Sequence, residues 1–331
     1  MFTHIYIENS VADHPRTQAI CARFPQAARV TCERYGEVFN PKSQDFRLQK
    51  AHPALILASK HGNRVLETPA GYGIGGARNY YFSHMLNCLY DCRYCFLQGM
   101  YRSANHVLFV NYESFETEIT RLSQNSSTPA WFFSGYDCDS LALEPVSGFA
   151  AHFLPFFARH PDAWLELRTK STQVRALLKH EPLANVVAAF SFTPREMHRS
   201  LEHRVPSVER RLAAMVQLQQ AGWLLGVRFD PLIYQQDYQA HYRELFNTVF
   251  SQLDADRLHS VSLGPFRLPR GYFRTISRLY PDEPLFAGPL SETDGMVSYH
   301  QDLEHELTGF CTGELRNHVS GSQLFPCTVA A

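Results

Sequence analysis

The chain has almost no net charge. Its 31 lysine and arginine residues offset 32 aspartate and glutamate residues, which leaves −1 at pH 7. A protein that binds nucleic acid mainly through its overall field is usually far more basic. Any contact with DNA or RNA must therefore come from a local basic surface.

Long hydrophobic runs are also missing, and no segment has the apolar length that a membrane span requires. The first residues, Met1–Glu8, become polar and acidic too early for a secretory leader. We therefore expect a cytoplasmic protein that does not enter a membrane.

Histidine metal motifs and low-complexity tracts are absent as well. None of the 16 histidines falls in a His-Glu-x-x-His pattern or another paired spacing, so we assign no histidine metal site. Hydrophobic residues make up 45% of the 331 residues and charged residues 19%, which excludes a disordered chain. This length indicates one large domain with appendages.

From residue 80 onward, short apolar segments alternate with segments of helical periodicity. The expected strands are Tyr80–Leu86, Ala130–Ser134, Trp164–Arg168, Val186–Phe192, Trp223–Phe229 and His259–Leu263. Repeated strand–helix alternation predicts an α/β fold with a parallel sheet, which right-handed crossovers curl into an open or closed barrel. In such barrels the chemistry lies at the C-terminal ends of the strands.

Smaller units are expected on both sides of this barrel. Within residues 1–79, Ile5–Glu8 and Ala28–Cys32 read as strands and Asp13–Phe24 as a helix, which predicts a small α/β appendage. Residues 80–300 form the expected barrel, and residues 301–331 form a C-terminal extension.

Three of the eight cysteines lie close together in the sequence. Cys88, Cys92 and Cys95 form a C-x3-C-x2-C pattern directly after the first barrel strand. Three thiolates at this spacing suit three irons of a [4Fe–4S] cube and leave the fourth iron open to the amino and carboxylate groups of a small molecule. Two alternatives remain: a structural zinc site completed by Cys138 or His84, and three free cysteines.

This motif, with Tyr94 before its last cysteine, resembles the signature of the radical S-adenosylmethionine superfamily. The wider segment, Cys88–Gln98, resembles the spore photoproduct lyase branch, and the similarity extends over about residues 70–300. The resemblance implies a partial (β/α)6 barrel, a [4Fe–4S] cluster and S-adenosylmethionine. It also implies repair of a thymine photolesion in DNA through a 5′-deoxyadenosyl radical, with an electron donor such as a flavodoxin or a ferredoxin.

The resemblance further implies cofactor contacts at the strand ends. Ser134–Gly135 would lie against the methionine amino group, and Lys170 would face the cofactor carboxylate. Ser191 and Arg228 end the next two strands and would also contact the cofactor. The alternatives are an ordinary turn, a surface lysine, a core serine, and an arginine paired with Asp230.

Two further positions are implied to take part in hydrogen transfer. Cys138 matches the thiol that returns a hydrogen atom to the thymine, although an alignment shifted by two residues would place Tyr136 there, and a packed, inert cysteine is the other alternative. The family commonly has tyrosine directly after the last cluster cysteine, where this chain has Phe96. Tyr94 therefore remains as the catalytic tyrosine of this segment.

Two other patterns bear on ligand binding. Gly71–Gly76 fits G-x-G-x-x-G but is followed by a strand, so we expect a loop and no dinucleotide site. Four arginines are spaced as on one helical face and would grip DNA phosphates beside a flipped base, unless they form only a solvated face: Arg267, Arg270, Arg274 and Arg278.

The leading interpretation is a spore photoproduct lyase-like carbon–carbon lyase. One alternative is a radical enzyme that acts on another nucleobase, a peptide or a metabolite, which Phe96 and the neutral charge favour. The other alternative is a non-catalytic nucleic-acid-binding module with structural zinc.

Overall fold

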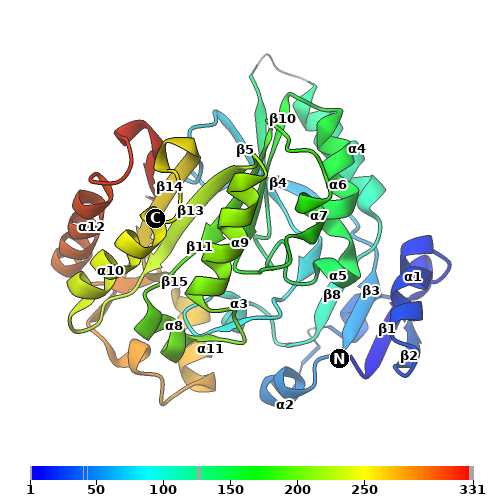
Figure 1. Ribbon diagram of the computed structural model, residues 1–331. Helices are drawn as coiled ribbons and strands as arrows, with labels where there is room; N and C mark the ends of the chain where they lie inside the picture. Colours follow the sequence, from blue (N-terminus) through cyan, green and yellow to red (C-terminus); the bar gives the residue numbers. More distant parts are fainter. Residues whose placement is uncertain (1, 40, 43, 125–127, 328–331) are drawn as a thin grey trace.

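The computed structural model describes residues 2–39, 41–42, 44–124 and 128–327, which form two main sheets with helices around them (Figure 1). The larger sheet has eight strands in the order β18-β14-β13-β11-β10-β9-β5-β4. Its six central strands are β5 (Arg78–Phe82), β9 (Ala130–Ser134), β10 (Ala163–Thr169), β11 (Val186–Ser191), β13 (Leu224–Leu232) and β14 (Leu258–Pro265). In chain order, successive members of this set of six pair in parallel, which confirms the partial (β/α)6 barrel.

The expected barrel strands are present, although the first is shorter than the sequence indicated. The segment Tyr80–Leu86 is divided: β5 ends at Phe82, and β6 (Met85–Leu86) pairs antiparallel with β8 (His106–Phe109) in the smaller sheet. The chain turns between them because the His84 carbonyl accepts a hydrogen bond from a backbone N–H of β8 (2.9 Å).

The helices between the barrel strands cover the outer face of the sheet (Figure 1). They are α4 (Tyr112–Ser123), α5 (Glu144–Ser147), α6 (Phe149–Ala158), α7 (Arg175–Leu178), α8 (Arg195–Leu201), α9 (Val208–Gln220) and α10 (Tyr238–Phe250). Pro155 lies inside α6 and does not interrupt it. Pro155 lies on the exposed face of the helix, where water can satisfy the carbonyl that proline leaves without a donor.

The smaller sheet has the order β2-β1-β3-β8-β6. It contains β1 (His4–Glu8), β2 (Ala28–Cys32) and β3 (Leu55–Ala58), with α1 (Pro15–Arg23) beside it. Because β6 and β8 come from beyond residue 80, this sheet takes strands from both sides of the expected boundary. One apolar cluster joins this sheet to Cys138, which comes from the loop after β9.

The remaining elements include one short strand at each edge of the larger sheet. At the two edges of the larger sheet, β4 (Val65–Glu67) pairs with β5 and β18 (Leu324–Pro326) pairs with β14. The other elements are α2 (Phe46–Ala51), β7 (Asp91–Cys92), α3 (Leu97–Met100), β12 (Glu202–His203), β15 (Arg267–Pro269), α11 (Arg270–Leu279), β16 (Leu290–Thr293), β17 (Met296–Tyr299) and α12 (Gln301–Leu315). None of the described helices is both long and apolar enough to cross a lipid bilayer.

Candidate active site

A cavity of about 460 Å³ opens at the C-terminal ends of the barrel strands. Five barrel strands contribute residues to its lining near their ends: Ser134, Thr169, Ser191, Asp230 and Pro265. The opposite wall comes from residues 87–98, which we call the cysteine loop, and from α2, β15 and α11. The functional residues therefore gather at the edge of the sheet that barrel topology predicted.

The cysteine loop presents three thiols to this cavity. Cys88, Cys92 and Cys95 are free and all line it. The loop begins at Asn87, which has a left-handed backbone (φ 67°). Its side-chain Nδ2 donates hydrogen bonds to the backbone carbonyls of Ser103 (2.8 Å) and Asn105 (2.7 Å). This geometry turns the chain away from β6 and aims the following cysteines inward.

The chemistry of these thiols suits iron. Burial raises the pKa of Cys88 to about 12, so the sulfur becomes a ligand only when a metal stabilises the thiolate. Burial also raises the pKa of Cys92 and Cys95, while the Lys170 ammonium acts in the opposite direction on both.

The three thiols fit an iron–sulfur cube better than they fit one ion. Among the residues that the structure describes, no three His, Cys, Asp or Glu side chains are placed to hold a single metal ion. A cube does not require such convergence, because each cysteine binds a different iron. The donor set therefore matches a [4Fe–4S] cluster with one open iron.

The end of β9 forms a tight turn at the cavity wall. The Ser134 hydroxyl donates to the Glu166 carbonyl (2.8 Å) and also bonds the Ser140 hydroxyl (2.8 Å). Gly135 has φ 83°, and a Cβ at this position would lie 2.6 Å from the Ser140 Oγ. Only glycine fits this turn, which keeps the backbone at Ser134–Gly135 open to the cavity.

Asp139 organises the neighbouring strand end and was missed from the sequence. Its carboxylate accepts hydrogen bonds from the Thr169 hydroxyl (2.7 Å) and the Lys170 N–H (2.6 Å). It also accepts from the N–H groups of Leu141 (2.9 Å) and Ala142 (2.8 Å). The available signal was an acidic residue in the polar loop that follows β9, but nothing local indicated its partners on β10.

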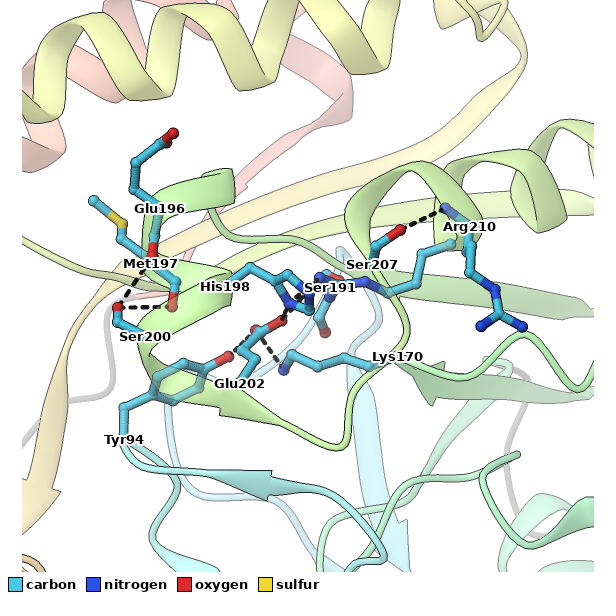
Figure 2. Close-up of polar contacts among 11 residues, drawn as sticks. Tyr94, Lys170, Ser191, Glu196, Met197, His198, Ser200, Glu202, Ser207 and Arg210 are labelled. Atoms are coloured by element: carbon cyan, nitrogen blue, oxygen red, sulfur yellow. Dashed lines mark hydrogen bonds and ion pairs between the residues drawn. The ribbon is translucent and has the colours of Figure 1, made fainter.

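Lys170 lines the cavity and meets a carboxylate that the sequence did not reveal. Its ammonium lies 3.9 Å from Glu202, which also accepts from the Tyr94 hydroxyl (Figure 2). Burial alone would raise the pKa of Glu202, but Arg211 and Lys170 outweigh it and hold that pKa well below its usual range. Glu202 follows α8, and its sequence neighbours gave no sign of a role in the cavity.

Cys138 lines the cavity as a buried thiol. Its sulfur lies 3.9 Å from the Nδ1 of His84, whose ring stacks on Phe149 with centroids 3.9 Å apart. Burial raises the pKa of Cys138 well above its usual value and lowers that of His84 to about 3. Both groups are therefore uncharged near neutral pH, and the thiol keeps its hydrogen.

Of two residues that the resemblance implied as cofactor contacts, Ser191 lines the cavity and Arg228 does not. Ser191 lines the cavity, with its carbonyl accepting from the Arg211 guanidinium (2.6 Å). Arg228 is completely buried, and its guanidinium bonds the Glu166 carboxylate (2.7 Å) and the Ser260 hydroxyl (2.9 Å). Asp230, the alternative partner, lies instead 3.4 Å from Arg267.

Aromatic rings surround the cysteine loop. The Phe96 ring lies 5.4 Å from Tyr136 and 6.4 Å from Tyr272, centroid to centroid, and all three residues line the cavity. Tyr72, within the Gly71–Gly76 loop, also lines the cavity and accepts a hydrogen bond from Arg168 (3.1 Å).

The prediction that four arginines share one helical face is wrong for Arg267. Arg267 lies on β15, lines the cavity and donates to the sulfur of Cys327 (3.1 Å). Pro269 ends β15 and stands directly before the first residue of α11, where its missing N–H removes no helix hydrogen bond. Arg270, Arg274 and Arg278 remain as an exposed row on α11.

Comparison with known proteins gives consistent similarities. The family model described as spore photoproduct lyase matches residues 76–286. The spore photoproduct lyase of Bacillus subtilis (strain 168) is 22% identical over 234 residues, which cover 66% of this chain and 68% of that protein. The spore photoproduct lyase of Clostridium acetobutylicum is 20% identical over 209 residues, which cover 62% of each chain.

Solved structures share the fold over almost the whole chain. A spore photoproduct lyase complexed with dinucleoside spore photoproduct has a TM-score of 0.84 at 18% identity and covers 99% of this chain and 98% of its own. A variant with bound AdoMet and dinucleoside spore photoproduct has the same TM-score of 0.84 and identity of 18%, with coverage of 100% and 99%. The smaller sheet and the C-terminal extension therefore belong to the shared architecture.

Proposed function

The chain belongs to the spore photoproduct lyase family, and on this premise we propose that it is a radical S-adenosylmethionine lyase that repairs a thymine photolesion in DNA. One observation carries the proposal: the three thiols of the cysteine loop and the buried thiol of Cys138 line the same cavity. This shared lining supports a cluster on the three loop thiols and a hydrogen donor at Cys138.

The residues around the cavity have distinct parts in holding the cofactors. Cys88, Cys92 and Cys95 would ligate the [4Fe–4S] cluster, and Ser134–Gly135, Lys170 and Ser191 would line the space for S-adenosylmethionine. When bound, this pair supplies a 5′-deoxyadenosyl radical. We expect a cytoplasmic flavodoxin or ferredoxin to provide the electron.

Cys138 suits the return of a hydrogen atom to the repaired base. Because burial keeps its pKa high, the group is an S–H at neutral pH and not a thiolate. Transfer of that hydrogen atom to a thymine radical breaks the S–H bond, forms a C–H bond and leaves the unpaired electron on the sulfur. A hydrogen atom must then return to Cys138 before the next turnover.

That return cannot use a hydroxyl at Phe96. Tyr94, the catalytic tyrosine that the resemblance implied, lines the cavity, but its hydroxyl donates to Glu202. A role for Tyr94 in returning hydrogen therefore requires this hydroxyl to leave the carboxylate.

The DNA surface is proposed to run along α11. The inner face of this helix places Tyr272 in the cavity lining, while Arg270, Arg274 and Arg278 are exposed on the other side. Phosphates that flank a flipped lesion would meet these arginines, since a stacked base cannot enter a cavity of this kind.

The test uses protein reconstituted without oxygen and given dithionite, S-adenosylmethionine and a dinucleotide spore photoproduct. We expect about four irons per chain, release of 5′-deoxyadenosine and recovery of the thymine dinucleotide. The Cys88→Ala variant should lose the cluster, whereas Cys32→Ala, in the smaller sheet, should retain it. Cys138→Ala should consume the lesion without restoring normal thymine.

One outcome would instead support a radical enzyme that acts on another nucleobase, a peptide or a metabolite. If the protein cleaves S-adenosylmethionine but recovers no thymine, the radical chemistry stands and the lesion is not its substrate. Phe96 is the observation that favours this second candidate, because the family tyrosine is missing there.

A further inference from the structure

A buried polar cluster centred on Glu202 lies behind the wall of the cavity. Glu202 is 3% exposed, and its carboxylate is surrounded by four side chains: Tyr94, Lys170, His198 and Arg211. Two of these, Tyr94 and Lys170, line the cavity, while the other two come from α8 and α9. A buried carboxylate with this many partners constrains all of them.

The two carboxylate oxygens face different parts of the molecule. Oε2 accepts from the Arg211 guanidinium (2.8 Å) and lies 2.9 Å from the His198 Nδ1, which anchors it to the helices. Oε1 accepts from the Tyr94 hydroxyl and lies 3.9 Å from the Lys170 ammonium (Figure 2). Glu202 thus connects a rigid anchor to two side chains at the cavity.

The backbone ties the same residue to the cysteine loop. In the small ribbon of β7 and β12, Glu202 pairs directly with Cys92, and the Arg93 N–H donates to the Leu201 carbonyl (2.8 Å). The carboxylate and one proposed cluster ligand are therefore fixed relative to each other. A shift of Glu202 would be transmitted to the loop through these main-chain bonds.

The charges of this cluster are not balanced. The Glu202 carboxylate faces two cations, Arg211 and Lys170, so one positive charge remains in excess. The separation of 3.9 Å leaves Lys170 a weaker partner than Arg211, which lies at 2.8 Å.

We propose that Glu202 is a positioning residue of the cofactor site: it holds Tyr94 and Lys170 in the cavity wall and sets the charge that Lys170 presents to the cysteine loop. This inference rests on the proposed function, because it presumes a cluster on Cys88, Cys92 and Cys95. In the free enzyme Glu202 partly offsets the ammonium and keeps it oriented toward the cavity. An anionic group of the cofactor then meets a lysine that is already in place.

The test is the reduction potential of the reconstituted cluster, measured without S-adenosylmethionine. Glu202→Gln removes a negative charge beside the cysteine loop, so the reduced state of a cluster held there becomes more favourable and the potential should rise. Lys170→Gln removes a positive charge and should lower it. Glu202→Asp retains the negative charge, so its cluster should have a reduction potential close to that of the wild-type protein.

Glu196→Gln is the matched control, because Glu196 lies on α8 but pairs with His241 at the surface (3.1 Å). The inference is overturned if Glu202→Gln and the control have the same potential at full iron content, or if Lys170→Gln leaves the potential unchanged. The second criterion applies even if Glu202→Gln does not fold. If the wild-type protein itself binds no cluster, the proposed function is contradicted instead.

Discussion

At the scale of single residues, burial decides which groups around the cavity carry charge. The Cys138 sulfur lies 3.9 Å from the His84 ring; Cys138 belongs to an apolar cluster, and the buried His84 ring stacks on Phe149. The uncharged form of each is therefore favoured, and the thiol does not transfer its proton to the imidazole. This protects the S–H bond on which the proposed role of Cys138 depends.

His84 should make folding sensitive to acid. Its pKa is lowered to about 3 in the folded protein from an ordinary value of 6.5, so the unfolded chain takes up the proton first as the pH falls. Stability from this group is complete above about pH 6.5 and declines toward pH 3. Between pH 7 and pH 5 the loss amounts to about 2 kcal/mol.

Urea unfolding at both pH values measures this effect. His84→Leu should reduce the difference between the two free energies of unfolding by about 2 kcal/mol. His305→Asn, an exposed position on α12, is the control and should leave the difference unchanged. An equal pH dependence in all three proteins would contradict the assigned protonation of His84.

At the scale of elements, the ends of strands and helices position the chemistry. The turn after β9 requires glycine at residue 135 for two reasons, a left-handed backbone and a close approach to Ser140. Proline at residue 269 ends β15 directly before α11, and this boundary divides the arginines between the cavity and the surface.

Gly135→Ala and Gly148→Ala separate the two requirements at the β9 turn. Both glycines have positive φ, 83° and 57°, but an added Cβ at Gly148 would meet nothing within 4 Å. We expect Gly148→Ala to cost about 1 kcal/mol for the backbone alone. Gly135→Ala should cost more and should also weaken cofactor binding, which thermal unfolding and calorimetry would measure. Equal losses would show that the contact with Ser140 is unimportant.

The exposed arginines of α11 should contribute to DNA binding through phosphates. Arg274→Ala and Arg278→Ala should each weaken binding of a lesion-containing duplex and reduce the slope of log affinity against log salt by about 1. Arg243→Ala, on α10 and paired with Glu314 (2.8 Å), is the control. Unchanged slopes in both α11 variants would place the DNA on another surface.

At the scale of the whole molecule, a buried ion pair crosses the interior of the barrel. Arg228 on β13 bonds Glu166 on β10 (2.7 Å), with β11 between the two strands, and also bonds Ser260 on β14 (2.9 Å). On β10, alternation places Glu166 on the same face as Arg168, which lines the cavity. The pair thus supports the floor on which the site is built.

Removal of both partners should cost less than the sum of the two separate removals. Glu166→Gln leaves the Arg228 guanidinium buried without a counter-ion and should destabilise the protein by about 3–5 kcal/mol in urea unfolding. Glu166→Met combined with Arg228→Met should cost less than the sum of the two single changes. Glu314→Gln, in an exposed pair with Arg243, should cost less than about 1 kcal/mol. Additive losses at the buried pair would contradict this interpretation.

Local patterns were enough to identify most of the barrel and to single out the three cysteines proposed to hold the cluster. Each barrel strand is a short run of apolar residues between helical segments. Because such runs are buried, their positions can be predicted from the sequence alone. For the segment 80–86 the sequence predicted strand structure but not the division into β5 and β6. Both halves are apolar, and only the tertiary structure decides which sheet each half joins. The spacing of Cys88, Cys92 and Cys95 is likewise local, since one loop carries all three.

The sequence by itself therefore determined the parallel barrel, the end of the barrel where the cavity opens and the three cysteines that line it. The tertiary structure alone decided the partners of charged groups: Glu202 for Lys170 and Tyr94, Asp139 for the end of β10, and Glu166 for Arg228. The physical reason is distance along the chain. A buried charge is stabilised by whichever opposite charge the fold brings within a few ångströms, and no local pattern records that choice.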